Sequence, residues 1–168
     1  MSGRLIVYDA GERDAGEFAR GFGADDALFS ATPPVKTCVG CFGCWVKTPG
    51  RCVIADRAVD IPALFARSDE VVVVSPLAWG GYSRNVKAVL DRSIGYLLPF
   101  FRTVDGEMHH RMRHGNAFAF AVHFYGEGAP TVRENARRLV EANAVNLGAR
   151  SVDVRFHEGI AAAKEAVL

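Results

Sequence analysis

The fold is decided by the stretch VVVVSPLAWGGYS, residues 71–83. Its first four residues are valines, which are apolar on both sides of a strand, as a buried strand of a parallel sheet requires. Two glycines and a proline then interrupt the apolar run and predict a loop. Ser83 is a favoured helix cap, and the apolar residues after it recur at helical spacing up to Leu98. The stretch therefore predicts a buried strand, a loop and a helix.

The rest of the chain repeats this alternation. Further strands are expected at residues 5–8, 27–29, 117–124 and, at an edge of the sheet, 152–156. Helices are expected at residues 15–22, 61–67, 83–98 and 132–147, with a short one from residue 160. Residues 38–52 and 102–115 are expected to be loops. Five strands alternating with helices predict an α/β fold, a parallel five-stranded sheet of flavodoxin-like order 2-1-3-4-5.

Length and composition exclude several classes of protein. The 168 residues predict one domain over residues 1–168, and 49% hydrophobic residues are typical of a globular chain. No apolar run approaches the ~20 residues of a membrane span. Met1–Arg4 leads directly into the first strand without a signal-peptide pattern, so a cytoplasmic protein is expected. A net charge of +1 argues against a nucleic-acid partner.

In the predicted fold, ligands bind beyond the carboxyl ends of the strands, where the strand order reverses. The loops at that edge are residues 9–14, 76–83 and 124–130. Glycine at 80 and 81 allows the backbone to approach a flat ligand, and Trp79 or Tyr82 can stack on it. The alternative is a glycine turn whose two aromatic side chains pack locally.

All four cysteines lie within residues 38–52, at positions 38, 41, 44 and 52. In a chain without a signal peptide such a cluster indicates metal or redox chemistry. The compact spacing of Cys38, Cys41, Cys44 and Cys52 suits an iron–sulfur cluster, whereas structural zinc more often takes two separated pairs. Thiol redox chemistry of the Cys41/Cys44 pair, or simple packing of small apolar side chains in the loop, would also account for the cysteines.

Three segments carry a resemblance to a known family: CVGCFGCWVKTPGRCVIAD at 38–56, the 75–92 stretch with its SP, GG, Ser83, Lys87 and LDR residues, and DGEMHH at 105–110. The chain resembles the flavodoxin-like NAD(P)H-dependent FMN reductases and the iron–sulfur flavoproteins allied to them. The resemblance covers about residues 35–125, and it implies that FMN passes electrons from NAD(P)H to a flavin, a quinone or a similar small acceptor. It also implies that the four cysteines could hold an iron–sulfur cluster.

The resemblance also places a set of residues around FMN. On one side of the ring these are Pro76, Leu77, Ala78, Trp79, Gly80 and Gly81, and on the other side they are Phe124, Tyr125 and Gly126. No catalytic acid or base is expected, because the flavin itself carries the hydride chemistry.

Two features depart from the family pattern. The loop after the first strand is rich in Gly, Ser and Thr in the family and holds the FMN phosphate, but here it reads DAGERD at 9–14. Asp9, Glu12 and Asp14 would repel a phosphate and could themselves occupy the positive end of the helix, with Arg13 as partial compensation. Ala78 stands where the family often has Tyr. A cofactor-free interaction or regulatory module is therefore a second hypothesis, and an iron–sulfur electron carrier is a third.

The remaining candidates are histidines and an apolar run. His109, His110 and His114 are expected in a solvated basic loop rather than at a metal, and His123 is expected to be a core histidine. Residues 97–101, LLPFF, are expected to end the third long helix and to form the surface of a homodimer.

Overall fold

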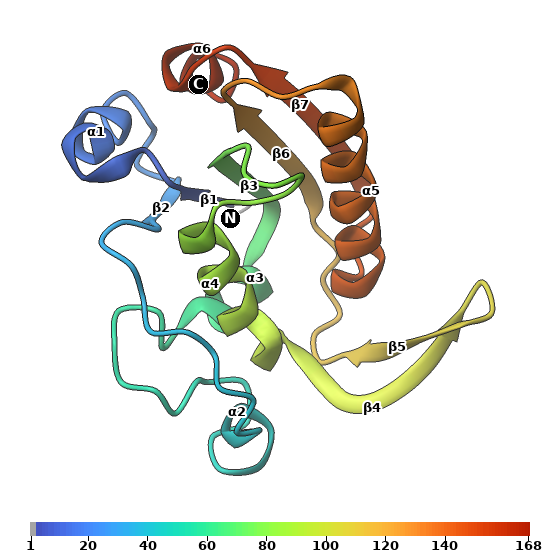
Figure 1. Cartoon of the computed structure of the whole chain (residues 1–168). Helices are drawn as coiled ribbons and strands as arrows, with labels where there is room; N and C mark the ends of the chain where they lie inside the picture. The colour runs from blue at the N-terminus through green and yellow to red at the C-terminus, as the bar shows by residue number, and fades with distance from the viewer. Residues whose placement is uncertain (1–2) are drawn as a thin grey trace.

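Figure 1 shows the computed structural model, which describes residues 3–168 as a parallel sheet between two layers of helices. The sheet contains β1 (Gly3–Tyr8), β2 (Ala27–Ser30), β3 (Ser68–Pro76), β6 (Ala119–Tyr125) and β7 (Ser151–His157). Their order is β2-β1-β3-β6-β7, which confirms the predicted order 2-1-3-4-5 with the last strand at an edge. The predicted absence of a signal peptide falls partly on Met1 and Ser2, which lie outside the described residues.

Helices cover both faces of the sheet. The described chain contains the helices α1 (Gly11–Phe18), α2 (Gly43–Val46), α3 (Ile61–Ala66), α4 (Arg84–Arg92), α5 (Pro130–Leu147) and α6 (Ile160–Glu165), of which α2 lies away from the sheet (Figure 1). Side chains of α3, α4 and α5 share one hydrophobic core with the sheet, and side chains of α1 and α6 share the core on the other face. Within residues 3–168, no helix is both long and apolar enough to cross a membrane.

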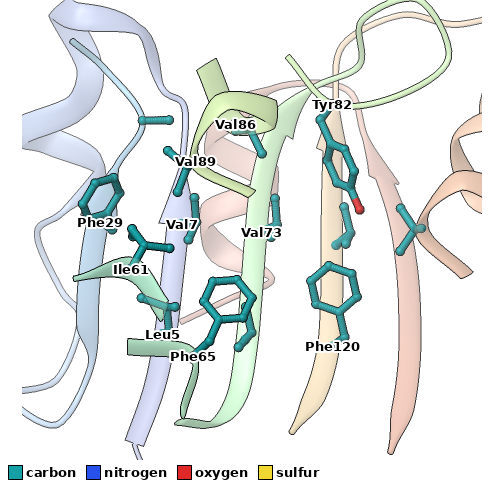
Figure 2. Close-up of a cluster of buried hydrophobic side chains, with 14 of the residues drawn as sticks. Leu5, Val7, Phe29, Ile61, Phe65, Val73, Tyr82, Val86, Val89 and Phe120 are labelled. Atoms are coloured by element: carbon teal, nitrogen blue, oxygen red, sulfur yellow. The ribbon is translucent and has the colours of Figure 1, made fainter. Parts of the chain in front are cut away.

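The valines of β3 lie at the centre of both cores, as their sequence predicts. Val71 and Val73 pack in the larger core, and Val72 and Val74 pack in the smaller one. Figure 2 shows the larger core, where Val73 on β3 faces Val86 and Val89 of α4. The four valines are almost completely buried, so the strand can lie only in the middle of the sheet.

The helix after the glycine loop is shorter than the sequence predicts. Ser83 caps α4, because its Oγ accepts a hydrogen bond from the Val86 N–H at 3.2 Å. The helix ends at Arg92, a 3-10 turn follows at Ser93–Tyr96, and Leu97–Val104 form strand β4. The prediction that residues 97–101 end the helix was therefore wrong. Pro99 is consistent with the extended backbone of residues 97–101, since proline cannot continue a helix and biases the residue before it toward extended backbone, but the helix itself ends earlier, at Arg92.

Residues 102–115 are not the predicted loop. β5 (Glu107–Met112) pairs antiparallel with β4 and forms a hairpin that projects from the body of the molecule (Figure 1). Asp105 and Gly106 make its turn with φ angles of 50° and 85°, the left-handed backbone that favours Asp-Gly in tight hairpins. The hairpin was missed because β5 carries polar side chains on both sides, so no apolar alternation marks it.

The first helix is also displaced from its prediction. α1 spans Gly11–Phe18, whereas the apolar spacing indicated residues 15–22. Phe18 is its buried anchor and stacks on Tyr8 of β1 with ring centroids 4.5 Å apart. Because the helix begins at Gly11, Glu12 and Asp14 stand in its first turn, next to the edge of the sheet where β1 ends.

Candidate functional site

The edge of the sheet where the strand order reverses is organised around one carboxylate. Asp9, which follows β1, is 5% exposed. Its Oδ1 accepts hydrogen bonds from Thr32 Oγ1 at 2.7 Å and from the Gly11 N–H at 3.3 Å. Its Oδ2 accepts a hydrogen bond from Ser83 Oγ at 2.7 Å. Asp9 thus joins the loops after β1, β2 and β3.

The same donors would be needed by a phosphate. An anion at this edge of a parallel sheet is normally held by helix N-terminal amides and by hydroxyls of the surrounding loops. Here the Thr32 and Ser83 hydroxyls and the Gly11 N–H already donate to Asp9. A second anion would meet a buried carboxylate instead of free donors. A phosphate at this edge would therefore have to compete with Asp9 for these donors.

The loop after β3, residues 76–81, lies against the loop after β6. The Leu77 N–H donates to the Tyr125 carbonyl at 2.9 Å, and Ala78 and Gly81 form an isolated antiparallel bridge. Trp79 stands at the tip of the turn with φ 52° and is fully exposed. A bulky residue with left-handed backbone is unusual, and such strain is frequent at functional sites.

The glycines of this loop allow α5 to come close. A Cβ on Gly80 would lie 3.3 Å from the Cβ of Asn135, and a Cβ on Gly81 would lie 2.7 Å from Leu139 Cδ2. The sequence suggests that these glycines make room for a flat ligand. In the structure they make room for α5, and Trp79 remains the side chain of the loop that is free to stack.

The three residues predicted on the opposite side of the ring differ in their environments. Phe124 is completely buried and packs between Tyr82 and Phe156, so its side chain belongs to the core and does not reach the edge. The hydroxyl of Tyr125 donates to the Asp9 backbone carbonyl at 2.7 Å. Gly126, with φ 100°, turns the chain away from β6. Tyr125 and Gly126 thus lie at the edge itself.

A cleft begins where this loop ends, at Tyr82. It has a volume of about 520 Å³ and lies between α4, α5, the β4–β5 hairpin and the cysteine segment, which we define as residues 38–52. Apolar side chains form most of its walls, and all four cysteines line it. Its lining includes Tyr82, Trp45, Lys87, Asp91, His110 and Asn143.

The cysteine segment is held against α4 by a buried arginine. Arg92, 1% exposed, donates two hydrogen bonds to the Asp56 carboxylate, at 2.9 and 3.0 Å. Its Nε also donates to Cys52 Sγ at 3.0 Å. Burial alone would raise the pKa of Asp56, but the hydrogen bonds from Arg92 and two backbone amides hold it below its ordinary value. Arg92 and Asp56, both inside the resembling segments, thus fix the position of the thiols.

The thiols share one wall of the cleft without forming a metal centre. Burial raises the pKa of Cys44, and the neighbouring Cys52, Cys38 and Cys41 raise it further. The four cysteines are free thiols. Over residues 3–168, no group of three or more His, Cys, Asp or Glu side chains is arranged to hold a metal ion. The iron–sulfur ligand set therefore stays a prediction.

The histidines are more buried than a solvated loop predicts. His109 is 8% exposed on β5, and its Nδ1 lies 2.9 Å from Asn146 Oδ1. His110 stacks on Phe101 and lies 5.0 Å from the Trp45 ring, which places it in the wall of the cleft. His123 is a hydrogen-bonded core histidine, as predicted. Only His114 is exposed in the manner that the sequence suggests.

Comparison with known proteins gives the class of protein. No family model matches the chain. A curated iron–sulfur flavoprotein from Methanocaldococcus jannaschii is 33% identical over 63 residues, 38% of this chain. The match spans only 32% of that protein, about a third of its length.

Solved structures agree on the fold. An NAD(P)H:quinone oxidoreductase from Methanothermobacter marburgensis has a TM-score of 0.61 to this chain and 14% sequence identity. The match covers 99% of this chain and 93% of that protein's chain. An FMN-dependent NADH-azoreductase from Bacillus anthracis, solved in complex with FMN, has a TM-score of 0.54 to this chain and 11% sequence identity. The match covers 100% of this chain and 90% of that protein's chain. The chain thus has a flavodoxin-like fold. Its sequence similarity to an iron–sulfur flavoprotein is limited to a 63-residue stretch.

Proposed function

We propose that the protein is a flavin-dependent oxidoreductase that transfers electrons from NAD(P)H to a small acceptor, in the manner of the FMN reductases that it resembles. The observation that carries the proposal is the 520 Å³ cleft, which begins at Tyr82 directly after the 76–81 loop. A concave, mostly apolar site of this size suits a small molecule. The cleft lies beside the loop of residues 76–81, which we call the edge loop, so an acceptor bound in the cleft would lie next to a flavin stacked on Trp79.

The protein's own part in such a reaction is positioning. The hydride chemistry would be the flavin's, so no side chain is proposed as an acid or base. We place the flavin ring at Pro76–Gly81, with Tyr125 and Gly126 at its other side. We further propose that the protein is cytoplasmic and forms a homodimer through the exposed apolar side chains of the hairpin, Phe100, Phe101 and Met108.

A second candidate function is supported by one observation, the engagement of Asp9. Because Asp9 already uses the hydroxyls of Thr32 and Ser83, a cofactor-free flavodoxin-like module is the competing proposal. Such a module would serve interaction or regulation, and its cleft would take a ligand that is not a nucleotide.

The decisive measurement is the absorption spectrum of freshly purified, anaerobic protein before and after excess FMN is added. The oxidoreductase proposal expects a flavin spectrum, or a perturbed FMN spectrum on addition, followed by oxidation of NADH or NADPH. A colourless protein that leaves the FMN spectrum unchanged, and that oxidises neither nicotinamide, would favour the cofactor-free module. A broad brown absorption, with iron and acid-labile sulfide in the same sample, would favour the iron–sulfur electron carrier.

A further inference from the structure

Two residues that line the cleft each carry a buried polar atom without a hydrogen-bond partner. The hydroxyl of Tyr82 and the Nδ1 atom of His110 are buried, and neither finds a hydrogen-bond partner among the described residues. Both residues line the cleft. Figure 2 shows the Tyr82 hydroxyl pointing along the sheet toward Phe120, away from the edge loop. A buried hydroxyl without a hydrogen bond is unfavourable, so its retention at a cleft calls for a partner from outside the chain.

The hydroxyl of Tyr82 is suited to donate. The residue is 7% exposed, and burial raises the pKa of its phenol far above the ordinary value. The phenol therefore stays neutral at any physiological pH and presents a proton to an acceptor atom. A carbonyl oxygen is the acceptor that a small organic ligand most simply offers at such a position.

The charges of the cleft exclude an anionic ligand. Lys87 forms a salt bridge with Asp91 on the next turn of α4, and Arg92 is bound to Asp56. The cationic side chains of Lys87 and Arg92 in the lining are thus already neutralised by carboxylates. A phosphate in the cleft would have to break one of these pairs, whereas a neutral ligand leaves both intact.

The walls fit a flat ring. Trp45 is fixed by a hydrogen bond from its Nε1 to the Leu97 carbonyl at 2.9 Å. His110 lies 5.0 Å from Trp45 and stacks on Phe101, so two aromatic rings of different segments form one wall. Leu97 and Leu139 line the cleft as well. Aromatic and branched apolar walls of this kind bind planar rings well.

We propose that the cleft is a binding site for a neutral, planar aromatic compound that carries a carbonyl oxygen, which accepts a hydrogen bond from the hydroxyl of Tyr82. The ligand's role as the electron acceptor rests on the proposed function, but its binding does not. The site is distinct from the edge loop of Trp79, and it selects against phosphorylated ligands.

Fluorenone tests the inference, because it is a neutral, planar tricyclic carbonyl compound that has neither a flavin ring nor a phosphate. We expect the native protein to bind it in a titration that follows tryptophan fluorescence. Tyr82→Phe should bind about tenfold more weakly through loss of one hydrogen bond, while its melting temperature does not fall because the orphaned hydroxyl is gone. Asn143→Trp, which places a large ring in the cleft from α5, should abolish binding.

Two matched controls separate the cleft from the rest of the molecule. Glu141→Trp adds the same side chain to the exposed side of α5, and Tyr8→Phe removes a hydroxyl from the smaller core on the other face of the sheet. Both should bind fluorenone as the native protein does. The inference fails if native protein does not bind fluorenone, if Asn143→Trp binds normally, or if Trp79→Ala removes binding while Tyr82→Phe does not.

The same samples distinguish this inference from the proposed function. Fluorenone binding with the expected variant pattern, but without oxidation of NADH or NADPH, would uphold the site and overturn the oxidoreductase proposal. Oxidation of a nicotinamide together with fluorenone binding that is unchanged in Tyr82→Phe and Asn143→Trp would do the reverse.

Discussion

Asp9 has the largest consequence of any single residue at the candidate site. Its carboxylate takes hydrogen bonds from Thr32, Ser83 and Gly11, three segments that meet at the edge of the sheet. The buried charge is compensated by these donors, so a further anion at this edge must compete with Asp9 for them. One side chain thus weakens the binding of a phosphorylated cofactor at this edge.

Replacing Asp9 by Ser should open that site. Asp9→Ser removes the buried charge and frees the hydroxyls of Thr32 and Ser83, so we expect FMN to bind at least tenfold more tightly than to the native protein. Riboflavin, which lacks the phosphate, should bind both proteins equally. Isothermal titration with the two flavins measures this, and a gain for riboflavin as large as that for FMN would contradict the explanation.

A second residue-scale prediction concerns His123. Its ring stacks on His157 at an interplanar angle of 5°, with 3.0 Å between Nδ1 and Nε2. Burial and, secondarily, His157 and Arg155 lower the pKa of His123 to about 4. The unfolded chain takes up this proton near pH ~6.5, so it binds more protons than the folded chain between the two values.

Stability should therefore be lost as the pH falls from about 6.5 toward 4, and the full contribution is present above that range. Urea unfolding at pH 7 and pH 4.5 measures the loss. In His123→Gln, which has no imidazole at this position, the difference between the two pH values should be smaller. An unchanged difference would mean that other groups control the acid sensitivity.

At the scale of elements, the β4–β5 hairpin was not predicted from the sequence, although it forms part of the wall of the cleft. It carries His110 into the wall of the cleft, and its turn depends on left-handed backbone at Asp105 and Gly106. A hairpin outside the main sheet is marginally stable by itself, so its turn and its contacts with the cysteine segment hold it in place.

Gly106→Ala should loosen this hairpin. Because Gly106 has φ 85°, an alanine there is strained, and we expect a loss of about 1 kcal/mol in the free energy of unfolding. Gly115→Ala is the matched control, since Gly115 lacks positive φ and a Cβ there would meet nothing within 4 Å. Urea unfolding of both variants checks this, and equal losses would show that the turn conformation is not the cause.

At the scale of the whole molecule, the hairpin also exposes apolar side chains. Phe100, Phe101 and Met108 are 63%, 55% and 73% exposed, on an element whose strand edges are open. Apolar groups gathered on a projecting hairpin favour association between copies of the chain. This surface differs from the predicted residues 97–101 in being a strand instead of a helix end, in the burial of Leu97 and in the addition of Met108.

Phe101→Asp should convert the proposed homodimer to a soluble monomer, because it places a charge in the apolar contact. Light scattering of the purified protein measures the mass. Val46→Asp is the control, since Val46 is 77% exposed on α2, outside the hairpin. A Phe101→Asp variant that is still dimeric would exclude this surface.

The sequence by itself determined the frame of the protein. Four consecutive valines can be buried on both sides only in a central parallel strand, and Ser83 after a glycine loop starts a helix, so residues 71–83 fix the strand, the loop and the cap. The acidic loop at 9–14 likewise predicts, from charge alone, an edge unfavourable to phosphate. Each of these features depends on residues that are adjacent in the chain, so the sequence pattern is enough to predict it.

The contacts of Asp9 and the lining of the cleft were decided by the tertiary structure, because they depend on which distant segments of the chain meet. Asp9 meets Thr32 and Ser83 only after three strands have aligned. Tyr82 and His110 line the same cleft although 28 positions separate them in the chain, and nothing local marks their polar atoms as unpaired. Burial and hydrogen-bond satisfaction are properties of the packed molecule, so the sequence indicated where a ligand site should lie but not which atoms would be left to bind one.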